Sequence, residues 1–177
     1  GGKTTTSLSL AHKGFTLSTD DASVLHENTD WPLVWGIPRA MKVHFNTARL
    51  LPWLGEFPEA WNRFGEQSVP LAQLEGLIGM VDTPRPNKLG AIVFLGERSS
   101  GDHILRPMPK GDALVAIAHD NVAWRPAGMT SRAQHRFSAL ADMVASVPTF
   151  ELSAGENLDT LSDVISSAMT AALRVGA

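Results

Sequence analysis

The residues best suited to chemistry stand at the start of the chain, in Gly1-Gly2-Lys3-Thr4-Thr5. Gly2-Lys3-Thr4 matches the closing half of the phosphate-binding motif G-x-x-x-x-G-K-[ST], in which backbone N–H groups and a helix N-terminus cradle phosphates. In that motif the lysine reaches the β- and γ-phosphates, and the hydroxyl of the next residue binds Mg²⁺. The stretch therefore predicts a nucleotide site in which all five residues contact the phosphates. Because Gly-Lys-Thr also occurs by chance, the residues downstream decide the matter.

Two adjacent carboxylates, Asp20 and Asp21, follow the motif after one helix and one short strand. A nucleotide site needs a carboxylate at a strand end, either as a metal ligand or as a base. Neighbouring side chains of an extended chain point to opposite sides, so one carboxylate would hold Mg²⁺ while the other faces the attacking hydroxyl. Taken alone, the pair would fit a solvated turn. Because the phosphate-binding motif precedes the pair, we favour the interpretation that Asp20 and Asp21 belong to the nucleotide site.

These groups need a helix after the Gly-Lys turn and a strand that delivers the carboxylates. The sequence predicts the helix over residues 4–13, ended by Gly14, because glycine commonly follows the last helical turn. A short alternating strand is expected over 15–19, leading directly into Asp20. That strand would bring the carboxylates to the edge of the sheet at which the helix begins.

The rest of the chain alternates between strand-like and helix-like patterns. Strands are expected over 22–26, 39–45, 77–81, 90–95, 103–108 and 150–152, and helices over 46–51, 110–119, 130–146 and 158–174. Residues 55–75 show no regular pattern, and 83–87 are expected to be a loop. The continuous apolar run 91–95 is typical of a strand covered on both faces. The chain is therefore expected to be an α/β domain with one mixed sheet flanked by helices.

Cationic side chains further along are candidates for contact with a transferring phosphoryl group. Arg39 and Lys42 lie on or beside the strand expected over 39–45, and an arginine there would stabilise the charge of that group. A surface or structural role also fits both, and Lys42 more than Arg39. Arg106, on the strand expected over 103–108, could meet a phosphate but fits a structural role better.

Composition argues against several other classes of protein. The 177 residues are 44% hydrophobic and 19% charged, as is typical of a globular domain with a sizeable core. A net charge of −3 without a dense Lys/Arg run argues against a nucleic-acid surface. No apolar run approaches the roughly 20 residues of a membrane span. The absence of cysteine removes disulfides and thiolate metal sites and fits a cytoplasmic protein.

The motif and the acidic pair together resemble the HPr kinase/phosphorylase family, whose ATP-binding core is shared with phosphoenolpyruvate carboxykinase. The residues that carry the resemblance are Gly2-Lys3-Thr4 and Ser18-Thr19-Asp20-Asp21. Shorter kinase-like proteins of the same superfamily are similar over more of the chain. Those further segments are 2–8, 37–42, 91–95, 105–108 and 148–152.

The resemblance implies ATP-dependent, Mg²⁺-dependent transfer of the γ-phosphoryl group to a hydroxyl, with the serine of a protein or peptide as acceptor. It implies that Lys3 contacts phosphates, that Thr4 binds Mg²⁺, that Asp20 is the catalytic base and that Asp21 is a metal or positioning carboxylate. Arg39 is our further catalytic candidate. The alternatives are a regulatory module that binds nucleotide without transferring phosphate, and a phosphohydrolase that acts on phosphoserine. A homo-oligomer is compatible with each of these functions.

The complete family motif begins with a strand and a glycine that would stand before Gly1. We therefore expect an N-terminally truncated chain that lacks the first strand and the start of the P-loop. The remaining residues, 1–177, are expected to form a single ATP-binding domain.

Overall fold

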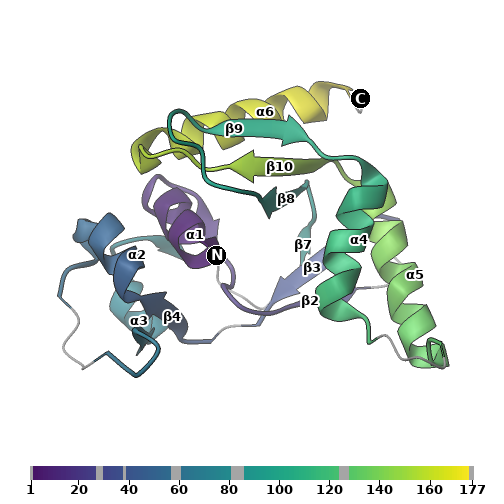
Figure 1. Ribbon diagram of the computed structural model, residues 1–177, viewed down its shortest axis with the longest axis horizontal. Helices are drawn as coiled ribbons and strands as arrows, with labels where there is room; N and C mark the ends of the chain where they lie inside the picture. The colour runs from purple at the N-terminus through teal and green to yellow at the C-terminus, as the bar shows by residue number, and fades with distance from the viewer. Residues whose placement is uncertain are drawn as a thin grey trace.

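The computed structural model describes residues 2–26, 30–37, 39–56, 61–80, 86–123 and 128–175. Helices and strands are mixed along the chain, which confirms the α/β class expected from the sequence (Figure 1). In these ranges the strands pair in four small sheets. The expectation of one mixed sheet is therefore wrong for the described part of the chain. Within the same ranges, no helix is long and apolar enough to cross a membrane.

Two of the sheets contain parallel pairs of strands. β1 (Thr16–Leu17) runs parallel to β6 (Gly79–Met80). β8 (Ile92–Leu95) runs parallel to β10 (Thr149–Ser153), which pairs antiparallel with β9 (Ile104–Pro107) on its other side. Because parallel strands end at the same edge of a sheet, the segments that follow β8 and β10 lie close together. A backbone hydrogen bond of 2.9 Å from Ser99 to Ala154 joins them.

The other two sheets are antiparallel. β3 (Leu33–Gly36) pairs with β2 (Ser23–His26) on one side and β7 (Asn87–Lys88) on the other. β4 (Met41–His44) pairs with β5 (Glu66–Val69). Side chains of β4 alternate between buried and exposed, so Lys42 and His44 share its exposed face.

Helices cover the sheets on several sides (Figure 1). α6 lies along the β8–β10–β9 sheet, and α4 and α5 pack side by side. The helices are α1 (Lys3–His12), α2 (Phe45–Leu50), α3 (Leu71–Leu74), α4 (Lys110–Asn121), α5 (Ser131–Ser146) and α6 (Leu161–Val175), and short 3-10 turns cover Pro52–Leu54 and Leu158–Thr160.

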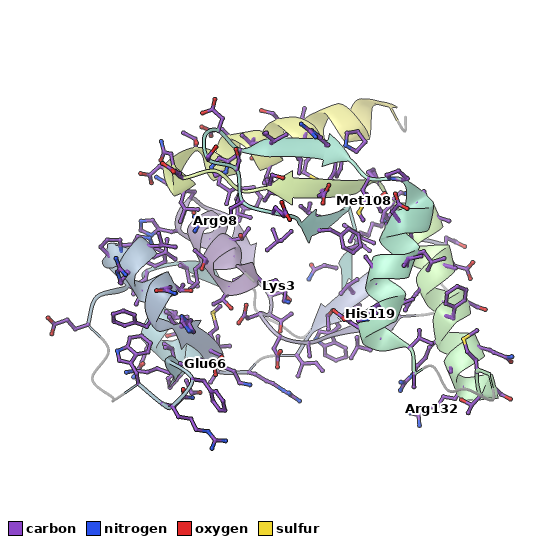
Figure 2. The ribbon with its side chains drawn as sticks, in the orientation of Figure 1. Lys3, Glu66, Arg98, Met108, His119 and Arg132 are labelled. Carbon is purple, nitrogen blue, oxygen red and sulfur yellow. The ribbon has the colours of Figure 1, made fainter. Side chains whose placement is uncertain are left out.

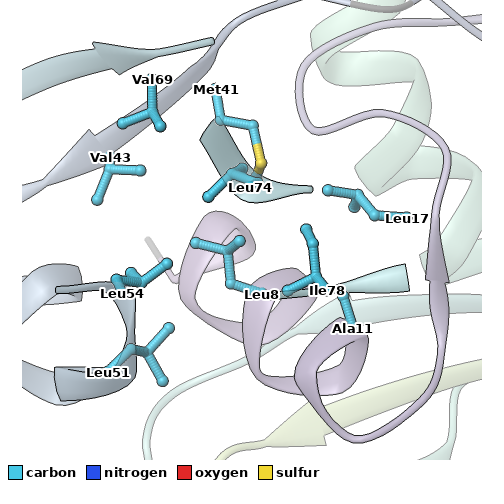
Figure 3. Packing of buried hydrophobic residues seen from close by; sticks show 10 residues of the cluster. All are labelled: Leu8, Ala11, Leu17, Met41, Val43, Leu51, Leu54, Val69, Leu74 and Ile78. Carbon is cyan, nitrogen blue, oxygen red and sulfur yellow. The ribbon is translucent and has the colours of Figure 1, made fainter. Parts of the chain in front are cut away.

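α1 contributes to two hydrophobic clusters, and this double packing fixes where its N-terminus lies. Leu8, fully buried, and Ala11 pack in one cluster with residues of β1, β4 and β5 (Figure 3). Leu10 faces a second cluster that contains Leu95 of β8 and Leu152 of β10. Burial of a leucine side chain stabilises a fold by roughly 1.5–3 kcal/mol, so α1 is held firmly from both sides.

The structure differs from the sequence-based expectations at further places, and one of them is β3, a strand that was not expected. Residues 55–75 contain β5 and α3, which were missed because Gln67 is a buried polar residue and hides the apolar alternation of β5. Asn87, expected in a loop, begins β7 and pairs with Val34. The expectation for 91–95 is confirmed, because Ile92 and Phe94 on one face of β8 pack against one hydrophobic cluster, and Val93 and Leu95 on the other face pack against a second.

Candidate functional site

The N-terminus of α1 offers backbone N–H donors that no side chain of its own first turn occupies. Gly2 caps the helix at a φ of 103°, a left-handed conformation that favours glycine. No side chain in the described residues caps this end, and its first turn contains no acidic residue. The first N–H groups of any helix have no partner within it, and its dipole places partial positive charge there. This end of α1 therefore suits an anion.

A cavity of about 220 Å³ opens beside this helix start, and we call it the polar cavity. It carries two ammonium groups, Lys3 and Lys42, against one carboxylate, Glu66. The cavity is smaller than the roughly 300–1,000 Å³ of whole small-molecule sites, so it suits a phosphate-sized group. Its lining is Gly2, Lys3, Thr4, Thr5, Lys42, His44, Thr47 and Glu66. Figure 2 shows Lys3 on α1 and Glu66 on the neighbouring β5.

Hydroxyl and imidazole groups tie α1 to the elements across the polar cavity. The side-chain oxygens of Thr5 and buried Thr47 lie 2.8 Å apart, which fastens α1 to α2. His44 caps α2, because its Nδ1 accepts a hydrogen bond of 3.1 Å from the backbone N–H of Asn46. In the neutral ring this leaves the proton on Nε2, which can therefore act as a donor.

Asp20 lies against the helix start through a direct hydrogen bond. Thr4 Oγ1 donates to Asp20 Oδ2 at 3.0 Å, across 16 positions in sequence. The other carboxylate oxygen, Oδ1, is buried without a hydrogen-bond partner among the described residues. A buried acceptor without a partner costs roughly 1–3 kcal/mol, so such an atom calls for an explanation. A proton on this carboxyl, or a bound cation, would satisfy it.

Burial raises the pKa of the Asp20 carboxyl above its ordinary value. The negative charge of Asp21 adds to this rise, whereas the hydrogen bond from Thr4 and the charge of Lys3 oppose it. A carboxyl whose pKa is raised is a stronger base than an exposed aspartate, which is what proton abstraction near neutral pH needs.

The turn that carries Asp20 is fastened to β3. Thr19 Oγ1 donates hydrogen bonds to the carbonyl oxygens of Ala22, at 3.0 Å, and Ile37, at 2.9 Å. Ser18 packs directly on Gly36, where an added Cβ would lie 2.4 Å from Ser18 Oγ and 2.8 Å from its carbonyl oxygen. Only glycine allows this approach, so Gly36 sets the distance between β3 and the segment leading to Asp20.

Gly36→Ala is accordingly expected to lower the free energy of unfolding by roughly 1–3 kcal/mol, because the methyl group meets backbone atoms that cannot move alone. The variant should also displace Asp20 from Thr4. Urea denaturation measures the first effect, with Gly90→Ala as control, since an added Cβ there meets no described atom within 4 Å. Equal stability of the two variants would show that the Gly36–Ser18 contact is not restrictive.

The structure brings most of the predicted site residues together. Gly2, Lys3, Thr4 and Thr5 line one cavity, and Asp20 joins them through Thr4. Asp21 is exposed and close enough for its charge to act on Asp20. Arg39 is exposed and, within the described residues, lines neither cavity at the start of α1. Gly1 lies outside the described residues.

Sequence reasoning raised Lys42 as a candidate but favoured a surface role for it, and it did not place His44, Thr47 or Glu66 in the site. A signal was available for two of them, because residues two apart on a strand share one face, and Lys42 and His44 are such a pair. Glu66 stands opposite His44 in the β4–β5 register. Its strand was not expected, so no sequence pattern placed it there.

No protein-family model, no curated protein and no solved structure matches this chain.

Proposed function

We propose that this protein is an ATP-dependent kinase that transfers the γ-phosphoryl group of ATP to a hydroxyl, with a serine of a protein or peptide as acceptor. The observation that carries the proposal is the Thr4–Asp20 hydrogen bond of 3.0 Å at the exposed start of α1. It joins the hydroxyl of a phosphate-binding sequence to a partly buried carboxylate with one free oxygen. The resemblance of the motifs to the HPr kinase family, whose members contain a P-loop, supports the choice of phosphoryl transfer as the reaction and of serine as the acceptor.

The residues present fit a nucleotide-bound Mg²⁺ ion. This ion prefers oxygen ligands and is held by one or two carboxylates together with substrate phosphates and water. Thr4 and Asp20 place a hydroxyl and a carboxylate at one point, and Asp21 follows directly in sequence. The Oδ1 atom of Asp20 has no hydrogen-bond partner among the described residues, so its bonding capacity is unused. Bound Mg²⁺ would offset negative charge on the phosphates.

The chain's own groups have separate roles in this proposal. Lys3 and the free N–H groups of α1 hold the phosphates, and Lys42 adds a second cation across the polar cavity. Asp20 accepts the proton of the acceptor hydroxyl. The oxygen of that hydroxyl forms the new bond to the γ-phosphorus, and ADP leaves. The role predicted for Arg39 as a further stabilising cation stays a prediction.

A transfer assay tests the proposed function directly. The full chain is incubated with Mg²⁺, γ-labelled ATP and a library of serine peptides, with the matching alanine peptides as control. We expect label on serine peptides only, together with release of ADP. Binding of ATP without transfer to any peptide would instead favour a regulatory module. Release of phosphate from phosphoserine peptides without ATP would favour a phosphohydrolase.

The pH dependence of transfer follows from the environment of Asp20. A general base must be deprotonated, so the rate should fall as the pH drops through its pKa. Because burial raises that pKa, the fall of the transfer rate on the acid side of the pH–rate profile should lie above the ordinary aspartate value of 3.8. In the metal-free protein, Thr4→Val removes the hydrogen bond that lowers this pKa, so the Asp20 carboxyl should titrate at still higher pH, as followed by NMR. A fall of the transfer rate at the ordinary value in the wild type would contradict the assignment of Asp20 as base.

A further inference from the structure

A second and larger cavity adjoins the polar cavity, and we call it the apolar cavity. Its volume is about 620 Å³, within the roughly 300–1,000 Å³ typical of small-molecule sites. Gly2, Thr5, His44 and Thr47 line both cavities, so the two meet along the first turn of α1. A single elongated ligand can therefore occupy both, with one end in each.

The two cavities differ in chemistry. Leucines from four elements line the apolar cavity: Leu50 of α2, Leu95 of β8, Leu152 of β10 and Leu158 of the 3-10 turn before α6. The polar side chains among its lining include Asn46 and Arg98, and the latter follows β8. Apolar walls with a few polar groups are the usual surroundings of a flat heterocycle, whereas a phosphate needs cations and N–H groups.

The position of the apolar cavity in the fold also suits a nucleotide. Leu95 and Leu152 end or nearly end two parallel strands, and ligands of α/β proteins bind beyond the carboxyl ends of such strands. Arg98 is exposed and makes no ion pair or hydrogen bond within the described residues, so its guanidinium is free to meet a ligand. Arginine can stack on a planar ring or donate to its polar edge. Figure 2 shows Arg98 and Lys3 near the same helix.

We propose that the apolar cavity holds the nucleoside half of the bound nucleotide, with the base between the leucines and Arg98 as its polar contact. The phosphates would then cross Gly2 and Thr5 into the polar cavity. This inference rests on the proposed function and adds the part of the ligand that the motif at the chain start does not address.

The test compares ATP with inorganic tripolyphosphate, which carries the phosphate chain without the nucleoside. Both are titrated in the presence of Mg²⁺ into the wild-type chain, Arg98→Ala, Leu50→Ser and the control Arg106→Ala, using calorimetry. Arg98, Leu50 and Arg106 are all exposed, so their replacement should leave the fold intact. We expect ATP to bind the wild type more tightly than tripolyphosphate. Arg98→Ala should weaken the binding of ATP roughly tenfold, because one contact to a charged donor is lost. The affinity for tripolyphosphate should not change.

Each outcome separates this inference from the proposed function. A loss confined to ATP in Arg98→Ala or Leu50→Ser, and absent in Arg106→Ala, supports the nucleoside site. Equal affinities of the wild type for ATP and tripolyphosphate would overturn it and leave the phosphate site standing. The same applies if Arg98→Ala weakens both ligands equally, or if neither variant has any effect. Binding of neither ligand by the wild type would overturn both proposals.

Discussion

Replacing Asp20 by asparagine is expected to lower the rate of phosphoryl transfer by roughly 10²–10⁴-fold, the usual contribution of a general base. Asparagine keeps an oxygen that can accept the 3.0 Å hydrogen bond from Thr4, but it cannot take a proton from the acceptor hydroxyl. The affinity for MgATP should therefore change much less than the rate. Initial rates at saturating ATP, together with a separate binding measurement, distinguish the two effects.

The matched control is Asp102→Asn, which makes the same chemical change at an exposed position that lines neither cavity. It should leave the rate unaltered. Equal rates for Asp20→Asn and the wild type would exclude Asp20 as the base. Loss of ATP binding in Asp20→Asn with no separate effect on turnover would instead make it a binding residue.

The same variant should not lose stability at neutral pH. The pKa of Asp20 is raised in the folded state, so the folded protein holds this proton more tightly than the unfolded chain does. The stabilisation from this protonation is complete below the unfolded value of 3.8 and is lost as the pH rises through the folded pKa. At neutral pH the ionised, partly buried carboxylate therefore opposes folding, and asparagine removes that charge. Thermal unfolding of both proteins at pH 7 should give an equal or higher midpoint for the variant.

Lys3→Ala is expected to raise the Michaelis constant for ATP by roughly 10- to 100-fold, because a hydrogen bond to a charged group contributes about 1.5–3 kcal/mol. Lys3 lies in the first turn of α1, so its ammonium group and the helix dipole act on the same anion. Alanine is a good helix former, so α1 itself should persist.

Lys13→Ala serves as the control for this second variant, since Lys13 directly follows the other end of α1 and pairs with Asp159 at 2.7 Å. Exposed ion pairs of this kind contribute little to stability, and Lys13 lines neither cavity at the start of α1, so the Michaelis constant should not change. If both variants bind ATP like the wild type, the phosphates do not lie at the start of α1.

The elements nearest the site were the most accessible to prediction. The helix expected over 4–13 is α1 within one residue at each end, because Gly14 marks where it must end. The turn at Asp20 follows β1 as expected, and the Thr4–Asp20 contact joins two motifs that the sequence singled out separately. Local signals of capping, alternation and turn chemistry suffice for such short segments.

The wall of the polar cavity contributed by β4 and β5 was harder to predict from the sequence, because it depends on pairing between segments that are distant in sequence. Glu66 reaches the cavity only because β5 pairs with β4 in the register that sets it opposite His44. Register is fixed by burial on both strands, and the only side chains of β5 that are buried are Gln67 and Val69. Arg98 likewise reaches the apolar cavity through the arrangement of β8 and β10, which no local pattern specifies.

The most direct test of the phosphate site is to map backbone amide resonances of the labelled full chain as MgATP is added. The account predicts that the largest shifts occur at Lys3, Thr4 and Thr5, with smaller ones at Thr47, and none along α5 (Ser131–Ser146). The shifts should saturate with a single affinity, and in Lys3→Ala they should require roughly 10- to 100-fold more MgATP. Largest shifts elsewhere in the chain, or no shifts at millimolar MgATP, would contradict the proposal that the phosphates of a nucleotide bind at the N-terminus of α1.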